Sequence, residues 1–310
     1  MELKRRRYEG DEDTWRIRAF LRDVFLRNGR LDRSWQVYRF DYWHWHGIMN
    51  LGDGALEGIF IWEDGDGRIA AVLNQESDGQ VFLQVDPDFR SAELETEMIE
   101  TAEQYLARPV EGSHHLLVWA NEHDDMRQAL LAERGYVKEG WAEYQRRRTL
   151  DGPLPDHVPA AGYSVRALGE GAELLERCYA SGLAFHPDDV SYAVNNRSDA
   201  GWYRNIQNAP LYRRDLDIVA IAPDGAVASF CTVWFDDVTR SGAFEPVGTV
   251  PVHQRRGLGK AVMAEGLRRL QRIGATMAYV GSYSAEAHRL YESMGFTDYE
   301  LNEPWTRKFQ

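Results

Sequence analysis

The chain has 310 residues, which is enough for two domains with separate hydrophobic cores. Its formal net charge of −13 argues against a nucleic-acid-binding surface, and no apolar run approaches the length of a membrane span. The only two cysteines, Cys178 and Cys231, are expected as reduced core residues, and the charged start of the chain lacks a signal-peptide core, so we expect a cytoplasmic protein.

A strand, a hairpin and a strand leading into a helix follow one another in the first half of the chain, over residues 4–8, 59–73 and 81–87. Between the first two lies an aromatic cluster, Tyr42 to His46. Its two histidines have no nearby cysteine and no zinc-protease pattern, so we expect no metal site. We expect packed core here, and the alternative is a wall that holds a cationic substrate against Trp faces.

Glycine and proline punctuate residues 151–162, which predicts a linker. After it the same succession of strand, hairpin and strand before a helix returns, over residues 163–168, 218–234 and 247–250. Matching segments lie roughly 160 residues apart, as in a tandem repeat. The sequence therefore predicts an N-terminal domain at 1–150, a linker at 151–162 and a C-terminal domain at 163–310.

The most distinctive motif is Gln254 to Gly259, reading Q-R-R-G-L-G, between an apolar strand and a helical pattern. Free N–H groups at a helix start attract an anion, and we expect Gly257 and Gly259 to let a phosphate approach the backbone because they lack a Cβ. A nucleoside-triphosphate loop would need Ser or Thr at Ala261, and a dinucleotide loop would need Gly at Val262. The motif therefore predicts a pyrophosphate cradle, and the alternative is a surface turn that merely needs glycines.

A second motif, A-x-x-L-Y-x-x-x-G-F, lies on a helix that Ser284 or Ser282 can cap; its residues are Ala287, Leu290, Tyr291, Gly295 and Phe296. The two motifs in this order resemble those of the GNAT superfamily of acyl-CoA-dependent N-acetyltransferases. The resemblance is strong in the second half of the chain and faint in the first. The tandem plan is similar to that of the mycothiol synthase family.

The resemblance implies an α/β fold with α+β mixed sheets. It consists of two tandem GNAT folds, each a mixed, mostly antiparallel sheet with a splayed central strand flanked by helices. It also implies acetyl-CoA as co-substrate, without a metal. The pyrophosphate would lie on the backbone amides of Arg255, Arg256, Gly257, Leu258, Gly259 and Lys260. The pantetheine arm would pair with the strand edge at Val247, Thr249, Val250 and Val252. The start of the second helix, Ser284 and Ala287, would contribute too, although many members carry Asn in place of Ser284.

Acetyl transfer to an amine needs a base, an oxyanion donor and an acid for the leaving thiolate. The resemblance implies Tyr291 as the acid, and the alternative is a packed helix tyrosine. Glu245, just before Pro246, is the candidate base; the alternative is a solvent-facing strand residue, and a bulge at the proline could re-aim it. A backbone N–H near Thr249 or Val250 is the expected oxyanion donor. Four residues are reserve candidates that we expect to cap a turn or lie at the surface: His186, Asp188, Asp189 and His253.

The first copy lacks these groups. In the aligned sequence Glu93 and Glu95 stand where the second copy has its two motif glycines, and Leu131 stands where it has Tyr291. Each glutamate adds bulk and negative charge where a pyrophosphate would lie. We therefore expect residues 1–150 not to catalyse, and to serve as structure or as a wall of the substrate cleft.

The sequence thus favours an N-acetyltransferase that moves an acetyl group from acetyl-CoA to a primary amine of a small molecule, as a monomer or homodimer. One alternative is a non-catalytic acyl-CoA-binding sensor, against which Tyr291 and Glu245 argue. Another is a structural pseudo-enzyme, which the intact glycines disfavour. Four aromatic residues of the second copy are candidates for lining the acceptor cleft: Phe185, Trp202, Tyr203 and Trp234.

Overall fold

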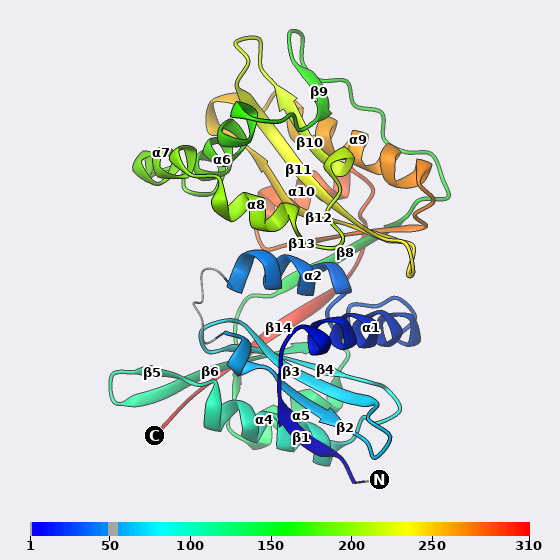
Figure 1. The fold of residues 1–310 in the computed structure, drawn as a ribbon, viewed down its shortest axis with the longest axis vertical. Helices are drawn as coiled ribbons and strands as arrows, with labels where there is room; N and C mark the ends of the chain where they lie inside the picture. Colours follow the sequence, from blue (N-terminus) through cyan, green and yellow to red (C-terminus); the bar gives the residue numbers. More distant parts are fainter. Residues whose placement is uncertain (1, 49–54) are drawn as a thin grey trace. The chain divides into compact units, whose positions relative to one another are not determined.

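The structure, a computed structural model, describes residues 2–48 and 55–310. Its contacts divide the chain into two compact units. Unit 1 comprises Met1–Tyr144 and Glu300–Gln310, and unit 2 comprises Gln145–Tyr299. Each unit is a mixed sheet with helices packed on it (Figure 1), which confirms the expected fold class.

In unit 1 the strand order is β1-β2-β3-β4-β6-β14. These strands span Lys4–Arg7, Phe60–Glu63, Ile69–Ser77, Gln80–Val85, Ser113–Asn121 and Asp298–Phe309, with short strands β5 and β7 at Arg108–Val110 and Val137–Lys138. The helices α1, α2, α4 and α5 span Asp11–Arg27, Val37–Tyr42, Ala92–Tyr105 and Asp125–Glu133. The single turns η1 and η2 lie at Trp43–Gly47 and Leu56–Gly58. The neighbouring strands β4 and β6 are parallel but share only two register pairs, Gln80 with Leu117 and Val81 with Val118.

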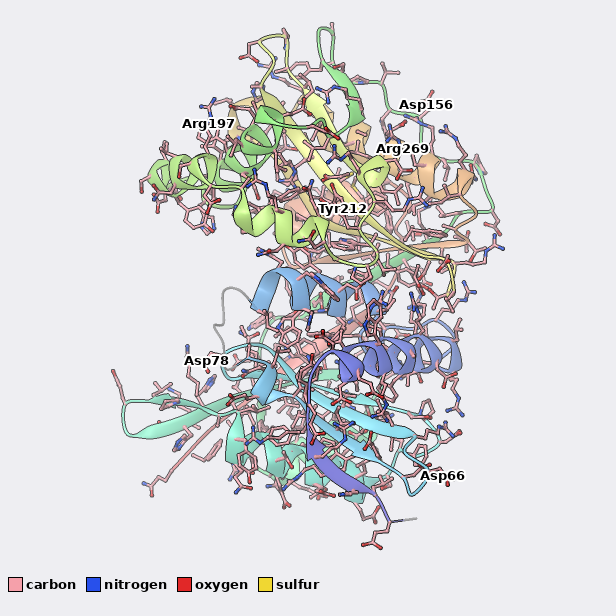
Figure 2. The ribbon with its side chains drawn as sticks, viewed as in Figure 1. Asp66, Asp78, Asp156, Arg197, Tyr212 and Arg269 are labelled. Carbon is pink, nitrogen blue, oxygen red and sulfur yellow. The ribbon has the colours of Figure 1, made fainter. Side chains whose placement is uncertain are left out.

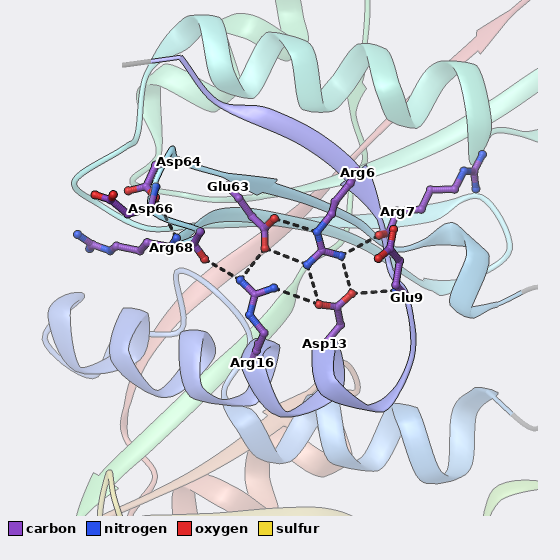
Figure 3. Close-up of polar contacts among 10 residues, drawn as sticks. Arg6, Arg7, Glu9, Asp13, Arg16, Glu63, Asp64, Asp66 and Arg68 are labelled. Carbon is purple, nitrogen blue, oxygen red and sulfur yellow. Dashed lines mark hydrogen bonds and ion pairs between the residues drawn. The ribbon is translucent and has the colours of Figure 1, made fainter.

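A charged network joins the first strand of unit 1 to its neighbours (Figure 3). Arg6 of β1 lies 2.6 Å from Asp13 of α1 and 2.8 Å from Glu63 of β2. Arg16, one turn along α1, lies 2.6 Å from the same Glu63. Charges this poorly exposed are stable only when they are paired, so the network fixes β1 against α1 and β2.

In unit 2 the strand order is β9-β10-β11-β12-β13-β8. The strands β8 to β13 span Glu143–Thr149, Ser164–Ala167, Asp217–Ile221, Val227–Asp236, Ser241–Thr249 and Met277–Ser282. The helices α6 to α10 span Ala172–Phe185, Val190–Ser198, Gly201–Gln207, Leu258–Arg272 and Ala285–Ser293. The single turns η3 and η4 lie at Arg214–Leu216 and Pro251–His253. The two hairpins expected at 59–73 and 218–234 are β2–β3 and β10–β11.

The two units have the same element order, but their last strands are exchanged. After α5 and the short strand β7 comes β8, whose residues 145–149 belong to unit 2, whereas the strand that follows α10 is β14, whose residues 300–309 belong to unit 1. This division differs from the expected boundaries at 1–150 and 163–310. The expected linker lies inside unit 2, where Gln271 of α9 donates a hydrogen bond to the Leu150 carbonyl at 2.7 Å.

The aromatic cluster, whose role the sequence left open, contributes to the hydrophobic core of unit 1. Trp43 of the aromatic cluster is 2% exposed and donates its indole N–H to the Glu76 carbonyl, so it is core as expected. Burial lowers the pKa of His46 in the same cluster to about 4. Within residues 2–48 and 55–310, no three His, Cys, Asp or Glu side chains are grouped as a metal site would require.

The surface reflects the acidic composition. Asp66, in the turn between β2 and β3, and Asp156, beside α9, are both exposed (Figure 2).

The two cysteines are free and buried, as expected. Among the described helices, none has the length and apolar character that a bilayer span requires.

Candidate active site

The site is built around β12, which is paired along its length on only one side. It pairs with β11 from Ser241 to Thr249. With β13 it shares three register pairs, all at its start, over residues 241–243. Beyond them, the edge of β12 that faces β13 has no strand partner among the described residues. This is the splayed central strand that was expected, and its open backbone edge can accept an extended ligand.

A bulge in β12 presents Glu245. Val233 pairs with Phe244 and Cys231 with Val247, so one residue of β11 lies opposite two residues of β12, Glu245 and Pro246. The proline at this position predicted the bulge, because a proline cannot donate to the ladder. The indole N–H of Trp234 donates to the Glu245 carbonyl at 2.7 Å and holds the bulge in place. Glu245 itself is half-buried.

Tyr291 lies on α10, close enough to Glu245 for their charges to interact. The helix is capped by Ser284, whose Oγ accepts the Ala287 N–H at 3.3 Å, so the expected capping role of Ser284 is confirmed. The Tyr291 side chain is 7% exposed. Burial raises the pKa of Tyr291, and the nearby Glu245 carboxylate raises it further. The phenol therefore keeps its proton at neutral pH, as a proton donor must.

The Q-R-R-G-L-G turn leaves a set of backbone N–H groups free at the start of α9. Gly257 is the N-cap, in the left-handed conformation with φ of 74°, and Arg255 is left-handed too, with φ of 61°. Among the described residues, the amides of 255–260 have no hydrogen-bond acceptor, and the first turn of the helix contains no acidic residue. Such a helix start suits a polyphosphate.

The two glycines of this turn have different surroundings. Gly257 is needed for its left-handed φ, and a Cβ there would meet open space. Gly259 faces inward instead: a Cβ there would lie 3.4 Å from Leu290 Cδ2 and 3.5 Å from Thr249 Oγ1. These are ordinary van der Waals distances, so the packing of α9 does not itself require a glycine at 259, and the role of Gly259 toward a phosphate stays a prediction.

The expected pantetheine edge is shorter than 247–252. Strand β12 ends at Thr249, and Val252 lies in η4 with its side chain 74% exposed. The Val250 N–H already donates to the Ala228 carbonyl at 3.0 Å, so Val250 was a wrong choice of oxyanion donor. Because backbone groups alternate along a strand, the Thr249 N–H points to the open edge instead.

Several reserve candidates have structural roles. Asp189 caps α7 by accepting the Tyr192 N–H at 3.0 Å, as expected. His253 is half-buried rather than a free surface residue, and its Nδ1 lies 2.9 Å from the Tyr163 hydroxyl. Tyr203 and Trp234 were wrong as cleft-lining residues, because they are 0% and 1% exposed. Sequence reasoning also missed the bond from Trp234 to the Glu245 backbone, since no local pattern marks a contact between strands.

Unit 1 has the same two helix starts with different residues. Leu131 occupies the same place in α5, the seventh residue, that Tyr291 has in α10. At α4 the N-cap is Ser91, so Ser91 rather than Glu93 is the counterpart of Gly257, and the preceding loop is shorter, 86–90 against 250–256. Glu95 is not at a ligand surface: it is 0% exposed and paired with Arg90 and Arg127.

Residues 175–296 match the profile described as "Acetyltransferase (GNAT) family". A mycothiol acetyltransferase of Acidothermus cellulolyticus is 28% identical over 280 residues, which cover 81% of each chain. Another, of Mycobacterium avium, is 33% identical over 174 residues, which cover 51% of this chain and 54% of that one.

Two solved structures share the fold over 99% of this chain. One is a tandem GNAT protein from the clavulanic acid biosynthesis pathway, with a TM-score of 0.67, 14% identity and 98% of that chain covered. The other is a GCN5-related N-acetyltransferase from Sphaerobacter thermophilus, with a TM-score of 0.63, 17% identity and 95% of that chain covered.

The matched profile begins within α6 and ends just after α10, so it includes the splayed strand, the uncapped turn and Tyr291. Residues 175–296 thus match the GNAT family, and the chain is an acyl-CoA-dependent N-acetyltransferase whose two units have GNAT-like folds in tandem. Within that family its plan is similar to that of the mycothiol acetyltransferases.

Proposed function

We propose that unit 2 transfers an acetyl group from acetyl-CoA to the primary amine of a small molecule, by direct attack of the amine. The observation that carries the proposal is a buried Tyr291, whose pKa burial and the Glu245 carboxylate both raise, beside the open edge of β12. An acid and a base at the edge of a splayed strand are what a ternary acyl transfer requires.

The residues present fit acetyl-CoA, whose thioester supplies the activated acetyl group. The free amides of 255–260 are the place for its pyrophosphate, and Arg255 and Arg256 are exposed beside them. Lys260, one turn into α9, adds positive charge at the same helix start. The open backbone edge at Val247 and Thr249 is the place for its pantetheine amides.

Glu245 takes the proton of the ammonium group, directly or through water, because only the neutral amine attacks. The Thr249 N–H, which points to the open edge, stabilises the oxyanion. Tyr291 then gives its proton to the leaving thiolate. The bulge at Pro246 sets the direction of the base, and burial of the phenol keeps the acid protonated.

Unit 1 is proposed to be non-catalytic, because Leu131 has no proton to give and Glu95 is bound to two arginines. The second candidate function, a sensor that binds acyl-CoA without turnover, would require neither Tyr291 nor Glu245. We also propose that residues 163–310 correspond to the catalytic copy of the sequence repeat.

The test is an acetyl-CoA turnover screen of the full chain against primary amines. Because the relatives above are named mycothiol acetyltransferases, the deacetylated form of mycothiol is the first acceptor, followed by amino acids, amino-sugars, aminoglycosides and peptides. Release of free CoA thiol with one of these amines supports acetyl transfer. Tight acetyl-CoA binding without turnover of any amine would favour the sensor instead.

A further inference from the structure

Arg177, in the middle of α6, is a buried cation without an acceptor. Its side chain is 0% exposed. In the described part of the chain, none of its three nitrogens, Nε, Nη1 and Nη2, has a hydrogen-bond partner. A guanidinium has five N–H donors, and leaving a buried donor unpaired is destabilising because its hydration is lost. Arg177 therefore needs an acceptor that the described residues do not supply.

Two aromatic rings hold the guanidinium in a flat slot. Its Cζ lies 3.5 Å from the centroid of the Phe230 ring and 4.9 Å from that of Tyr203. Contacts of this kind stabilise the cation through its face. Ring contacts do not use the N–H groups of the guanidinium, and a carboxylate is the acceptor whose two oxygen atoms match them.

Asp217 is a buried acid whose charge acts on Arg177, but it is not the missing hydrogen-bond acceptor. Its carboxylate accepts hydrogen bonds from the hydroxyls of Tyr203 at 2.6 Å, Tyr212 at 2.9 Å and Thr232 at 3.3 Å. Tyr212 reaches it from the segment between α8 and η3 (Figure 2). With three donors of its own, Asp217 acts on Arg177 only at longer range.

The slot lies next to the acyl-transfer strand. Phe230 on β11 pairs with Gly248 on β12, and a Cβ on Gly248 would lie 2.3 Å from the Phe230 ring. Arg177 is therefore separated from β12 by one ring, on the side of the sheet that α6 covers. Tyr291 packs with the core residues on the other side, such as Cys231 and Val262 of α9. With the acid on that side, the face of α6 is left for the acceptor.

We propose that Arg177 binds a carboxylate of the acceptor, so that unit 2 acetylates a small amine that also carries a carboxylic acid, of the amino-acid type. This inference rests on the proposed function. A carboxylate matches the planar fork of the guanidinium with two parallel hydrogen bonds.

The test compares, in the full chain, a series of amino acids with their carboxamides and with the corresponding amines that lack the group. In the wild type, kcat/KM should favour the carboxylates by roughly 10- to 100-fold, as a buried charge-assisted contact does. The ratio should fall to about 1 in Arg177→Met and partly in Arg177→Lys, which keeps the charge but not the fork. Because each ratio is internal to one variant, incomplete folding does not move it.

Arg197→Gln is the matched control. Arg197 is an exposed arginine on the neighbouring helix α7, paired with Glu176, and its removal should leave the ratio unchanged. If neither Arg177 variant folds, Phe230→Leu replaces them, because it removes one wall of the slot and should lower the same ratio.

An equal rate with carboxylates and carboxamides in the wild type, or an unchanged ratio in the variants, overturns the proposal. Preferred turnover of an uncharged amino-sugar would overturn it as well, although acetyl transfer itself would then be supported. If no amine is turned over, the proposed function fails, and the melting temperature with each amino acid and its amide still tests Arg177. A carboxylate-specific rise that Arg177→Met abolishes supports the binding role, and no such rise refutes it.

Discussion

The starts of α4 and α9 occupy the same place in the two units and differ in how their N–H groups are satisfied. At α4 the Ser91 hydroxyl accepts the Leu94 N–H at 3.2 Å, and the first turn holds Glu93 and Glu95. At α9 the cap is a glycine without a side chain, and basic residues precede it. A helix start that its own chain satisfies has little to offer an anion. The same fold thus contains one helix start whose N–H groups are capped and one whose N–H groups are free, and a few residues determine which of the two is present.

The largest expected effect comes from closing the open start. Gly257→Glu places a carboxylate at the cradle and forces a side chain into a left-handed φ, so acetyl-CoA affinity should fall by roughly 100-fold or more. Equilibrium titration measures this. Gly225→Glu is the control, because Gly225 has φ of 89°, open surroundings and no place in the site. Wild-type affinity in Gly257→Glu would rule out the cradle.

The second effect separates chemistry from binding. Tyr291→Phe, the mildest step toward Leu131, should lower kcat by roughly 100- to 10,000-fold while leaving acetyl-CoA affinity nearly unchanged. Because burial and Glu245 raise the pKa of Tyr291, the wild type should show no loss of the acid up to at least pH 10. Tyr136→Phe, in unit 1, is the control and should not affect kcat. An equal loss in both variants would show that the effect of Tyr291→Phe is structural.

A smaller effect tests the base. Glu245→Gln should lower turnover by about 10- to 100-fold at neutral pH, since the acceptor must then lose its proton to solvent. The deficit should shrink as pH rises toward the pKa of the amine, so the pH–rate profile is the measurement. Glu176→Gln, which changes a half-buried glutamate of α6 that is paired with Arg197, serves as control. A deficit that is constant across pH contradicts the role of Glu245 as base.

The smallest effect concerns the bulge. Trp234→Phe removes the bond to the Glu245 carbonyl and should lower kcat by about 2- to 10-fold without raising KM, because one neutral hydrogen bond is lost. Trp62→Phe is matched in burial and in lost volume, but the Trp62 indole N–H has no partner in the described residues. The argument for Trp234 fails if Trp62→Phe lowers kcat equally.

What the sequence could predict was local. Glycine favours a left-handed turn, serine favours a helix start and proline favours a bulge, because each acts directly on the backbone. Gly257, Ser284 and Pro246 occupy these three positions in the structure. The two-copy plan followed from the repeated spacing, and the splayed strand was implied by the resemblance to the GNAT superfamily. The cytoplasmic location and the oligomeric state stay predictions.

The contacts that the sequence could not predict depend on which strands and which faces of the sheets pack together. Three of the contacts described above join residues on different elements. They are the hydrogen bond from the Val250 N–H to Ala228, the hydrogen bond from Trp234 to the Glu245 carbonyl, and the ring contacts of Arg177. Composition does not reveal such contacts, because the same side chains would suit an ordinary core. The roles of Glu93 and Glu95 were misjudged for a related reason, since aligned letters do not show where a helix begins.

The exchange of last strands has a consequence for how the chain is made. Unit 1 cannot complete its sheet until residues 300–309 have been synthesised, after the whole of unit 2. Until then, the edge of β6 that receives them is exposed, and such an edge invites pairing with other chains. A gene fragment cut at 151–162 would leave both products incomplete: one would lack β14, and the other would lack β8. We therefore expect soluble, active protein only from the uninterrupted reading frame, which expression of the two fragments separately and together can check.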